Sequence, residues 1–306
     1  MTYCVAIRTD AGICFVSDSR TNAGVDNVST YSKMFCFEAP GQRQLVVLSS
    51  GNLATTQGVI AQIKKDAKRD AARSFANLET LEDIADYLGE CSAEHQEKHT
   101  GGGKAFEASF IVGGQIQGQK PGAYLIYPQG NHITTSRDTP YLQIGESKYG
   151  KPILDRIISS EISLETAALC GLVSMDSTMR SNLTVGPPIE VLMYEAGSLT
   201  NERRYRFEES SEYLRKLNAS WDDRLKEAFN DRRFPLLADQ RPYDSMTDLS
   251  QRWLRKVTPG KKPFFLNLCP NLVHGPVMTR DRKRLAHYCR KLGIPFPTDQ
   301  GSLSDP

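Results

Sequence analysis

The chain has 306 residues, of which 39% are hydrophobic, and its 38 Lys and Arg residues against 36 Asp and Glu residues give a formal net charge of +2. This length is enough for one full hydrophobic core and leaves room for a second module. The sequence has no run of eighteen apolar residues and no signal-peptide pattern at its start, which predicts a cytoplasmic protein and argues against a membrane partner.

The seven cysteines predict neither a disulfide framework nor a zinc site. They are odd in number, scattered along the chain and without a CxxC pair. The segment "HQEKH" at residues 95–99 has two histidines four residues apart, but its glutamate is not in the position that zinc-binding HExxH helices require. We therefore expect no metal and no cofactor.

The first fifty residues have the composition of β-strands. Residues 2–8 and 12–19 are rich in Val, Ile, Phe and Cys and are separated by "TDAG", which predicts a β-hairpin. The segments "KMFCFE" (33–38) and "QLVVLSS" (44–50) predict two further strands, because the residues between them include Pro and Gly in positions suited to a turn.

Two amphipathic helices are predicted next, at residues 52–75 and 80–99. Their apolar residues lie three and four positions apart, and Thr80 with Asp83 has the pattern of a capping box. Strand patterns then return in four segments, which are "AFEASFIVGG", "AYLIYP", "HITT" and "YLQIG".

A second pair of helices is predicted at about 149–159 and 163–180, followed by the strands "IEVLMYE" and "RRYRFEE". The order of strands, helix pair, strands, helix pair and strands is typical of two stacked sheets with helices on both outer faces. We predict an α+β fold with four layers in the order αββα. A last helix, at about 210–230, would close the domain.

Thr2 is the first candidate for a catalytic residue, because it lies one peptide bond behind the initiator methionine. A threonine hydroxyl is a poor nucleophile at neutral pH unless a base takes its proton, and an N-terminal threonine carries that base in its own α-amino group. This amine titrates at about 7.7–8.0. A nearby cation favours its neutral, basic form, and a carboxylate holds that cation in place. Such a site needs an N-terminal Thr, an acid and a lysine.

The register of the predicted hairpin decides which acid lies beside Thr2. A three-residue loop at 10–12 pairs Thr2 with Arg20 and places Asp18 on the same face, and the catalytic hypothesis depends on this register. A two-residue loop would put Ser19 opposite Thr2 and turn Asp18 away. Taken alone, the pattern also fits a protein that begins Met-Thr for no catalytic reason, with an ordinary ion pair near a strand end.

Several spaced motifs resemble the proteasome β-subunit family of N-terminal nucleophile hydrolases. They are "TYCVAIRTDAGICFVSDSRTNAG", "TYSKMFCFE" and "LSSGNLATTQ". Two more, "YLQIGESKYGKPILDRII" and "SMDSTMRSNLTVGPPIEVLMYE", are similar to signatures of the bacterial Anbu branch. The similarity runs from Thr2 to about residue 235. It implies an αββα sandwich of the N-terminal nucleophile hydrolase type at residues 1–242, with a C-terminal appendage.

The resemblance also implies roles for the residues that match the family's motifs. Thr2 would be the nucleophile, and Asp18 with Lys33 would be the pair that tunes and orients it. Arg20 follows the family's Asp-x-Arg pattern.

The remaining implied site residues come from later in the chain. Gly51 lies where the family places a backbone N–H that stabilises the tetrahedral oxyanion, and Asp176 takes the place of the family's second aspartate. Proteasome subunits usually have a Gly-Ser-Gly turn whose serine assists the amine, whereas this chain has Gly145-Glu146-Ser147. Glu146 and Ser147 are therefore alternative candidates for this role. A carboxylate there would raise the pKa of the amine or select a basic or small amide substrate.

Residues 243–306 differ in character from the rest, with 11 Lys and Arg against 5 Asp and Glu. The segment "KKPFFLNLCPNLVHGP" resembles an internal fragment of an arylsulfatase-type sulfatase, which implies that Lys262 and His274 derive from sulfate-binding residues. The metal-binding carboxylates and the formylglycine motif of sulfatases are missing from the sequence, so we expect a remnant that is neither active nor an independent domain. Binding of nucleic acid by this basic segment is not expected, because residues 264–266 have a buried-strand pattern and not that of a stacking platform.

The implied function is that of a threonine-type peptidase, which hydrolyses amide bonds of peptides or unfolded proteins through an acyl-enzyme ester. The resemblance places this activity inside a homo-oligomer, either a ring or an open helical stack. Two alternatives stay open. One is a narrow amidase or isopeptidase acting on small peptides, if Glu146 lines a pocket, and the other is a catalytically weak scaffold, if the mature chain retains Met1. The sequence does not indicate whether an ATP-driven partner exists.

Overall fold

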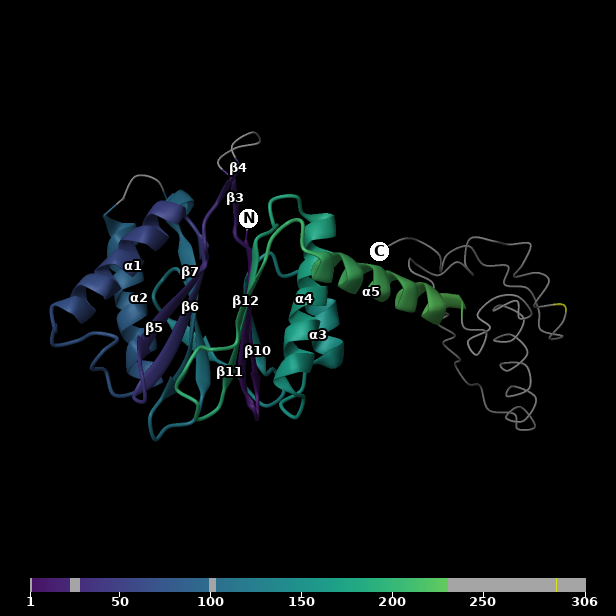
Figure 1. Cartoon of the computed structure of the whole chain (residues 1–306). Helices are drawn as coiled ribbons and strands as arrows, with labels where there is room; N and C mark the ends of the chain where they lie inside the picture. Colours follow the sequence, from purple (N-terminus) through teal and green to yellow (C-terminus); the bar gives the residue numbers. More distant parts are fainter. Residues whose placement is uncertain (1, 23–27, 99–102, 231–289, 291–306) are drawn as a thin grey trace. The chain divides into compact units, whose positions relative to one another are not determined.

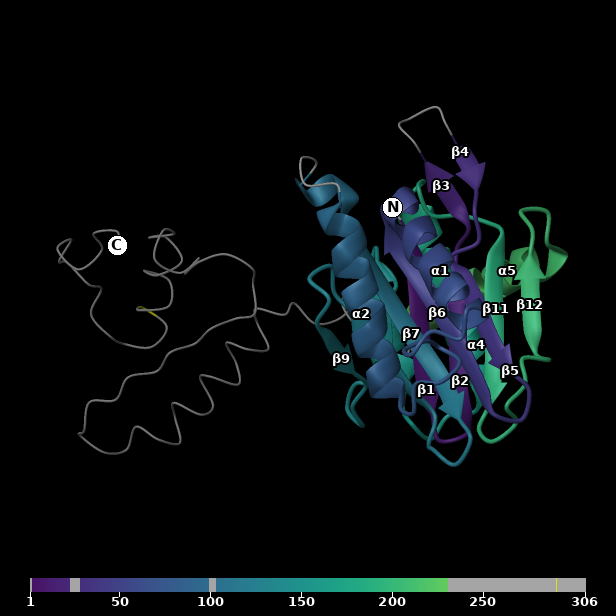
Figure 2. The same ribbon diagram turned by 90° about the vertical axis from the view of Figure 1, so that its left-hand side faces the viewer.

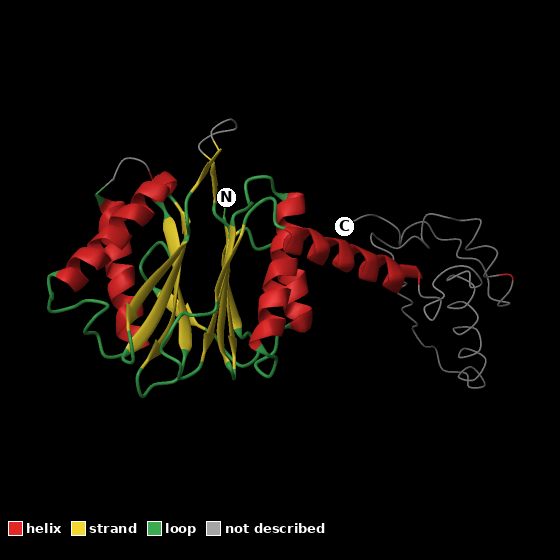
Figure 3. Ribbon diagram, in the orientation of Figure 1, coloured by secondary structure: helices red, strands yellow, loops and turns green. Residues whose placement is uncertain are grey.

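The computed structural model describes residues 2–22, 28–98, 103–230 and 290 of the chain (Figure 1). The described segments between residues 2 and 230 form two antiparallel five-stranded sheets that face each other between two layers of helices (Figure 3). The predicted four-layer α+β fold is therefore confirmed. The chain divides into two units, 1–229 and 230–306, but the predicted boundary at 242 and nearly all of the sulfatase-like segment lie outside the described residues.

The first sheet has the strand order β10-β1-β2-β11-β12. Its outer face is covered by helices α3 (Lys151–Ile157) and α4 (Leu164–Ser181) (Figure 1). Side chains of β1 alternate, so that Tyr3 packs toward the helices and Cys4 packs toward the second sheet. The strands are β1 (Tyr3–Thr9), β2 (Gly12–Ser17), β10 (Tyr141–Gly145), β11 (Ile189–Glu195) and β12 (Arg204–Phe207).

The second sheet has the order β5-β6-β7-β8-β9, and helices α1 (Leu53–Lys68) and α2 (Leu81–Glu97) cover its outer face (Figure 2). The predicted capping box at the start of α2 is present, since Thr80 and Asp83 each accept the other's backbone N–H. The strands are β5 (Met34–Ala39), β6 (Arg43–Gly51), β7 (Ala108–Ile116), β8 (Gly122–Ile126) and β9 (His132–Thr134).

Helix α1 ends earlier than predicted. It stops at Lys68, and Asp70 adopts a positive φ of 51°, which a helix cannot contain. Ser74 and Asn77 then close a turn, in which the Asn77 side chain accepts the Ser74 N–H at 2.8 Å. Turn-forming side chains thus outweigh the helical spacing of the apolar residues in this segment.

Four short or peripheral elements complete the description. Strands β3 (Arg20–Asn22) and β4 (Val28–Thr30) pair with each other and were not predicted, and a 3₁₀ turn covers Gly103–Phe106. The predicted last helix is α5 (Glu212–Asn230), from which Leu214 and Leu217 pack against the core beneath α3 and α4.

The register of the β1–β2 hairpin differs from the predicted one. Thr9 pairs with Gly12 and Cys4 with Ser17, so the loop has two residues, and the three-residue loop on which the catalytic hypothesis depended is wrong. The reason lies in a neighbouring strand. Gly12 also pairs with Glu195 of β11, and a Cβ at Gly12 would lie 1.9 Å from the Tyr194 carbonyl oxygen. Gly12 is therefore a strand residue that permits close packing, and not part of the turn.

Candidate active site

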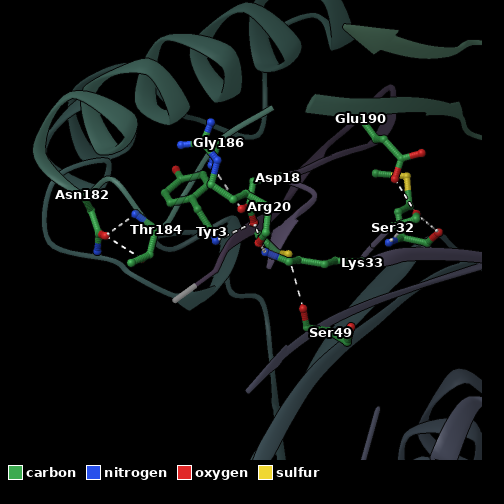
Figure 4. A network of polar contacts seen from close by, with 12 residues as sticks. Tyr3, Asp18, Arg20, Ser32, Lys33, Ser49, Asn182, Thr184, Gly186 and Glu190 are labelled. Carbon is green, nitrogen blue, oxygen red and sulfur yellow. Dashed lines mark hydrogen bonds and ion pairs between the residues drawn. The ribbon is translucent and has the colours of Figure 1, made fainter. Parts of the chain in front are cut away.

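Asp18 lies just past the end of β2, and its side chain is fully buried. Its Oδ1 accepts the Tyr3 backbone N–H at 3.0 Å and the Lys33 ammonium at 2.7 Å, and its Oδ2 accepts the Gly186 N–H at 3.3 Å (Figure 4). The expectation that a two-residue loop would turn Asp18 away is wrong. Because β2 ends at Ser17, the alternation of side chains no longer dictates the direction of the next residue.

Lys33 is the cation of this site and is only 7% exposed. Besides its ion pair with Asp18, its ammonium donates to the Arg20 carbonyl oxygen at 2.6 Å. The Lys33 carbonyl oxygen accepts the Ser49 N–H at 3.0 Å, which ties the residue to β6. Burial raises the pKa of the Asp18 carboxyl, and the Lys33 ammonium with the Tyr3 and Gly186 N–H groups partly offsets that rise.

Thr2 is 8% exposed and lies opposite Glu146 where β1 meets β10. The Thr2 carbonyl oxygen accepts the Glu146 N–H at 2.7 Å. Gly145 has a φ of +85°, and a Cβ there would lie 2.0 Å from the Thr2 carbonyl oxygen. Only glycine fits this position. The backbone of Thr2 is thus fixed on one side by β10, while Asp18 holds the N–H of the residue that follows.

Arg20 supports the site from the side of residues 183–186. Its Nη1 donates to the Leu183 carbonyl oxygen at 3.0 Å, and its backbone N–H donates to the Gly186 carbonyl oxygen at 3.2 Å. Gly186 lies so close to the guanidinium that a Cβ would be 2.4 Å from Cζ. Arg20 therefore helps hold the segment that supplies the second N–H to Asp18.

The structure distinguishes the two candidates in the Gly-Glu-Ser turn by their burial. Glu146 is 7% exposed, and its carboxylate accepts the Lys148 N–H at 3.2 Å and the Asn182 side-chain amide at 3.3 Å. No ion pair to Glu146 occurs within the described residues. Ser147 is exposed, and its carbonyl oxygen accepts the Lys151 N–H at the start of α3. Sequence reasoning missed Asn182, although it lies in one of the family-like motifs.

Gly51 ends β6 with a φ of +106°, and a Cβ there would lie 2.3 Å from the Glu107 carbonyl oxygen. It follows Ser49 by two residues, and Ser49 contacts both the Lys33 carbonyl oxygen and the Cys4 thiol. The backbone of Gly51 is therefore at the end of β6 that adjoins Lys33 and its partners Asp18 and Arg20, which we call the Lys33 cluster.

Asp176 is held in a different network. It accepts the Arg180 Nε at 2.9 Å, and Arg180 also pairs with Asp222 of α5 at 3.0 Å. Burial raises the pKa of the Asp176 carboxyl, and Arg180 opposes the rise. Among the contacts of the described residues, none joins Asp176 to Thr2 or Lys33, so the structure does not bring it into the cluster. Nor do three metal-ligating side chains come together anywhere in the described ranges.

Comparison with solved structures relates this geometry to known proteins. Anbu (ancestral β-subunit) from Yersinia bercovieri is 42% identical, with a TM-score of 0.73, and the match covers 78% of this chain and 99% of that chain. The chain belongs to the Anbu branch of the proteasome β-subunit family. The Anbu complex from Pseudomonas aeruginosa, described as a helical assembly, is 43% identical over 79% of this chain and 99% of that chain, with a TM-score of 0.73.

A glycine mutant of Anbu from Hyphomicrobium sp. strain MC1 is 42% identical over 76% of this chain and 97% of that chain, with a TM-score of 0.72. Family models and curated proteins gave no match. Because the Anbu chains are matched over nearly their whole length, about a fifth of this chain extends beyond them. No helix in the described ranges is long and apolar enough to cross a membrane.

Proposed function

We propose that this chain is a threonine-type peptidase whose nucleophile is Thr2, exposed by removal of Met1. The observation that carries the proposal is the buried pair of Asp18 and Lys33, 2.7 Å apart, whose carboxylate also holds the N–H of the residue after Thr2. A buried ion pair costs desolvation energy and is weak support for stability alone. The pair lies beside the first residue of β1, next to Thr2. We infer that its charges act on the Thr2 amine.

The proposed reaction has two halves. The α-amine of Thr2 takes the hydroxyl proton, and Oγ attacks the carbonyl carbon of a peptide bond. The N–H of Gly51 stabilises the resulting oxyanion. Collapse of this intermediate breaks the C–N bond, and the leaving amine takes the proton, which leaves an ester on Thr2. In the second half, the Thr2 α-amine takes a proton from water, and the resulting hydroxide attacks the ester. The acyl group leaves as a carboxylic acid, and the proton on the α-amine returns to Oγ, which restores Thr2.

Lys33 and Glu146 act in opposite directions in this scheme. The Lys33 cation favours the neutral amine, which is the base that the reaction needs. The buried Glu146 carboxylate favours the ammonium form. It also offers an acceptor to a basic group on a substrate, which supports the second candidate function, a narrow amidase or isopeptidase for small peptides. Parallel assays with an unfolded protein and with short peptide amides separate the two.

Assembly into a homo-oligomer is part of the proposal. Support comes from the related Pseudomonas aeruginosa Anbu, which is described as a helical assembly. A chamber formed by many copies would confine an unselective nucleophile to substrates that can enter.

The mass of the N-terminal peptide tests the catalytic proposal directly. We expect Met1 to be absent, and a threonine-directed β-lactone to add its mass to Thr2. Retention of Met1 would place the α-nitrogen in an amide, where it cannot act as a base. That result, or the absence of an adduct when a control threonine peptidase is modified, would support the scaffold alternative.

A further inference from the structure

Glu190 is a second buried carboxylate near the Lys33 cluster, and it lies on the face of the first sheet that packs against the second sheet. It pairs with Ser17 of β2, which pairs in turn with Cys4 of β1. Residues directly opposite one another in antiparallel strands share a face, and Cys4 belongs to the core between the sheets. Glu190 is 3% exposed, so its charge is withdrawn from water.

The carboxylate of Glu190 connects the edge strand β12 to the residue before Lys33. One oxygen accepts the Ser32 hydroxyl (Figure 4), and the other accepts Arg204 at 3.0 Å and lies 3.5 Å from Arg206. The two arginine side chains are 39% and 43% exposed. They neutralise the buried charge from the solvent side, which leaves the inner oxygen for Ser32.

Ser32 links Glu190 to the backbone of Met34, the residue after Lys33. Its hydroxyl donates toward Glu190, and its oxygen lies 3.3 Å from the N–H of Met34, from which it accepts a hydrogen bond. A carboxylate is a stronger acceptor than a neutral amide, so it directs the hydroxyl proton and leaves the oxygen lone pairs toward Met34. The Lys33 carbonyl oxygen is held by the Ser49 N–H.

The charges of Glu190 and of the Asp18–Lys33 pair also meet at Cys4. Burial raises the pKa of the Cys4 thiol, Asp18 raises it further, Lys33 lowers it, and Glu190 adds to the rise. Both carboxylates and the Lys33 ammonium therefore act on the same buried side chain.

We propose that Glu190 is a positioning residue for Lys33, acting through the Ser32 hydroxyl, which it binds. This inference rests on the proposed function in assigning the ion pair to catalysis. Lys33 has a long side chain with many rotamers, and its ammonium must reach both Asp18 and the Arg20 carbonyl oxygen. Glu190 and β6 hold the backbone at Lys33. This restricts the positions that the Lys33 ammonium can take and keeps it near Asp18.

The kinetic test compares acylation of Thr2 by a β-lactone in the full chain, Glu190→Gln, Ser32→Ala and the double variant. We expect the maximal acylation rate to fall about tenfold or more, with unchanged reversible affinity for the lactone. The double variant should be no slower than the slower single one, and Glu190→Asp should restore part of the rate. Glu165→Gln is the matched control, since it removes the partner of Arg203, a neighbour of Arg204 on the exposed surface. An unchanged rate in Glu190→Gln, or a loss in affinity only, would overturn the proposal.

A second measurement separates this proposal from the proposed function. Urea midpoints are compared for Glu190→Gln, Lys33→Met and their combination. Because Glu190 is expected to act through the residue next to Lys33, the combined shift should be smaller than the sum of the two single shifts. If Thr2 is never acylated in the parent chain, the proposed function fails while this comparison still decides the structural link. Additive shifts would refute the link.

Discussion

Replacement of Asp18 by Asn tests the energetic basis of the site. The Lys33 ammonium lies 2.7 Å from the carboxylate, and the two side chains are 8% and 0% exposed. The substitution keeps the shape of residue 18 but leaves the ammonium buried without a counter-charge. Breaking a buried pair in this way costs about 3 to 5 kcal/mol. The Tyr3 and Gly186 N–H groups bind different oxygens of the carboxylate, and the amide has only one oxygen, so one N–H also loses its acceptor. We therefore expect the upper part of this range.

Urea unfolding measures the effect. With a slope of about 1 to 3 kcal/mol per molar urea, the midpoint should fall by about 1 M or more. The double variant Asp18→Asn, Lys33→Met removes both charges and should recover much of the loss. Glu90→Gln is the matched control, because Arg73 and Glu90 are 2.6 Å apart but 51% and 53% exposed. Water and salt screen that pair, and its loss should leave the midpoint unchanged.

Two results would refute the reasoning. If Asp18→Asn shifts the midpoint no more than Glu90→Gln does, loss of the Asp18 charge carries no desolvation cost at Lys33, and the pair behaves like one exposed to water. If the double variant is no more stable than Asp18→Asn, an uncompensated ammonium is not the cause of the loss. Labelling of Thr2 by the β-lactone should be lost in both Asp18 variants, because each lacks the pair that orients the nucleophile.

Three further predictions concern the backbone, the thiols and the C-terminal segment. Gly145→Ala should lower the urea midpoint and abolish Thr2 labelling. Gly118→Ala is the control, because Gly118 has a similar φ of +79° and no atom near its Cβ, so it should cost only the backbone strain of about 1 kcal/mol. Equal effects of the two substitutions would exclude a clash between residue 145 and Thr2. Burial raises the pKa of Cys91 and Cys170 to about 11, so at pH 8 both should react with iodoacetamide about 100-fold more slowly than in urea. Equal iodoacetamide rates with and without urea would contradict the raised pKa values. The stability that these neutral thiols contribute is present below pH 9 and is lost as the pH rises through 11. Deletion of residues 243–306 should leave folding and assembly of residues 1–242 intact by circular dichroism and gel filtration; aggregation would count against a remnant.

Elements with strong periodicity could be predicted from the sequence, and those that depend on neighbours could not. The capping box at Thr80 and the strand at 189–195 were found because their signals are local. Strands β3 and β4 have three residues each, too few for a periodic pattern. The hairpin register failed for a different reason. Glycine is a common turn residue, and only the pairing of Gly12 with Glu195 of β11 shows that it belongs to the strand.

For the candidate site, the catalytic roles stay predictions, and the structure shows which of the named residues lie together. The three-residue register and the resemblance both indicate Asp18, and the resemblance indicates Lys33. The structure places the two side chains in contact, although it has the two-residue loop that was expected to turn Asp18 away. Asp176, implied by the same resemblance, is paired with Arg180 instead. Glu190 carried no signal, because a glutamate within an apolar strand acquires its meaning only from Ser32 and the β12 arginines. The Ser32 contact spans 158 residues of the sequence, and the Arg204 contact joins Glu190 to the next strand, so neither leaves a local pattern.

The donors to Asp18 also determine when the site can exist during synthesis. Tyr3 lies 15 residues from Asp18 in the sequence, but Gly186 lies 168 residues away, and Glu146, which holds Thr2, is made long after β1. Domains fold as units while the ribosome delivers the N-terminal part first. A nascent chain would therefore expose its first strand for most of its synthesis, before the site proposed around Thr2 is organised. Reactivity would arise only when the second half of the sandwich closes, so an incomplete copy could not damage its neighbours.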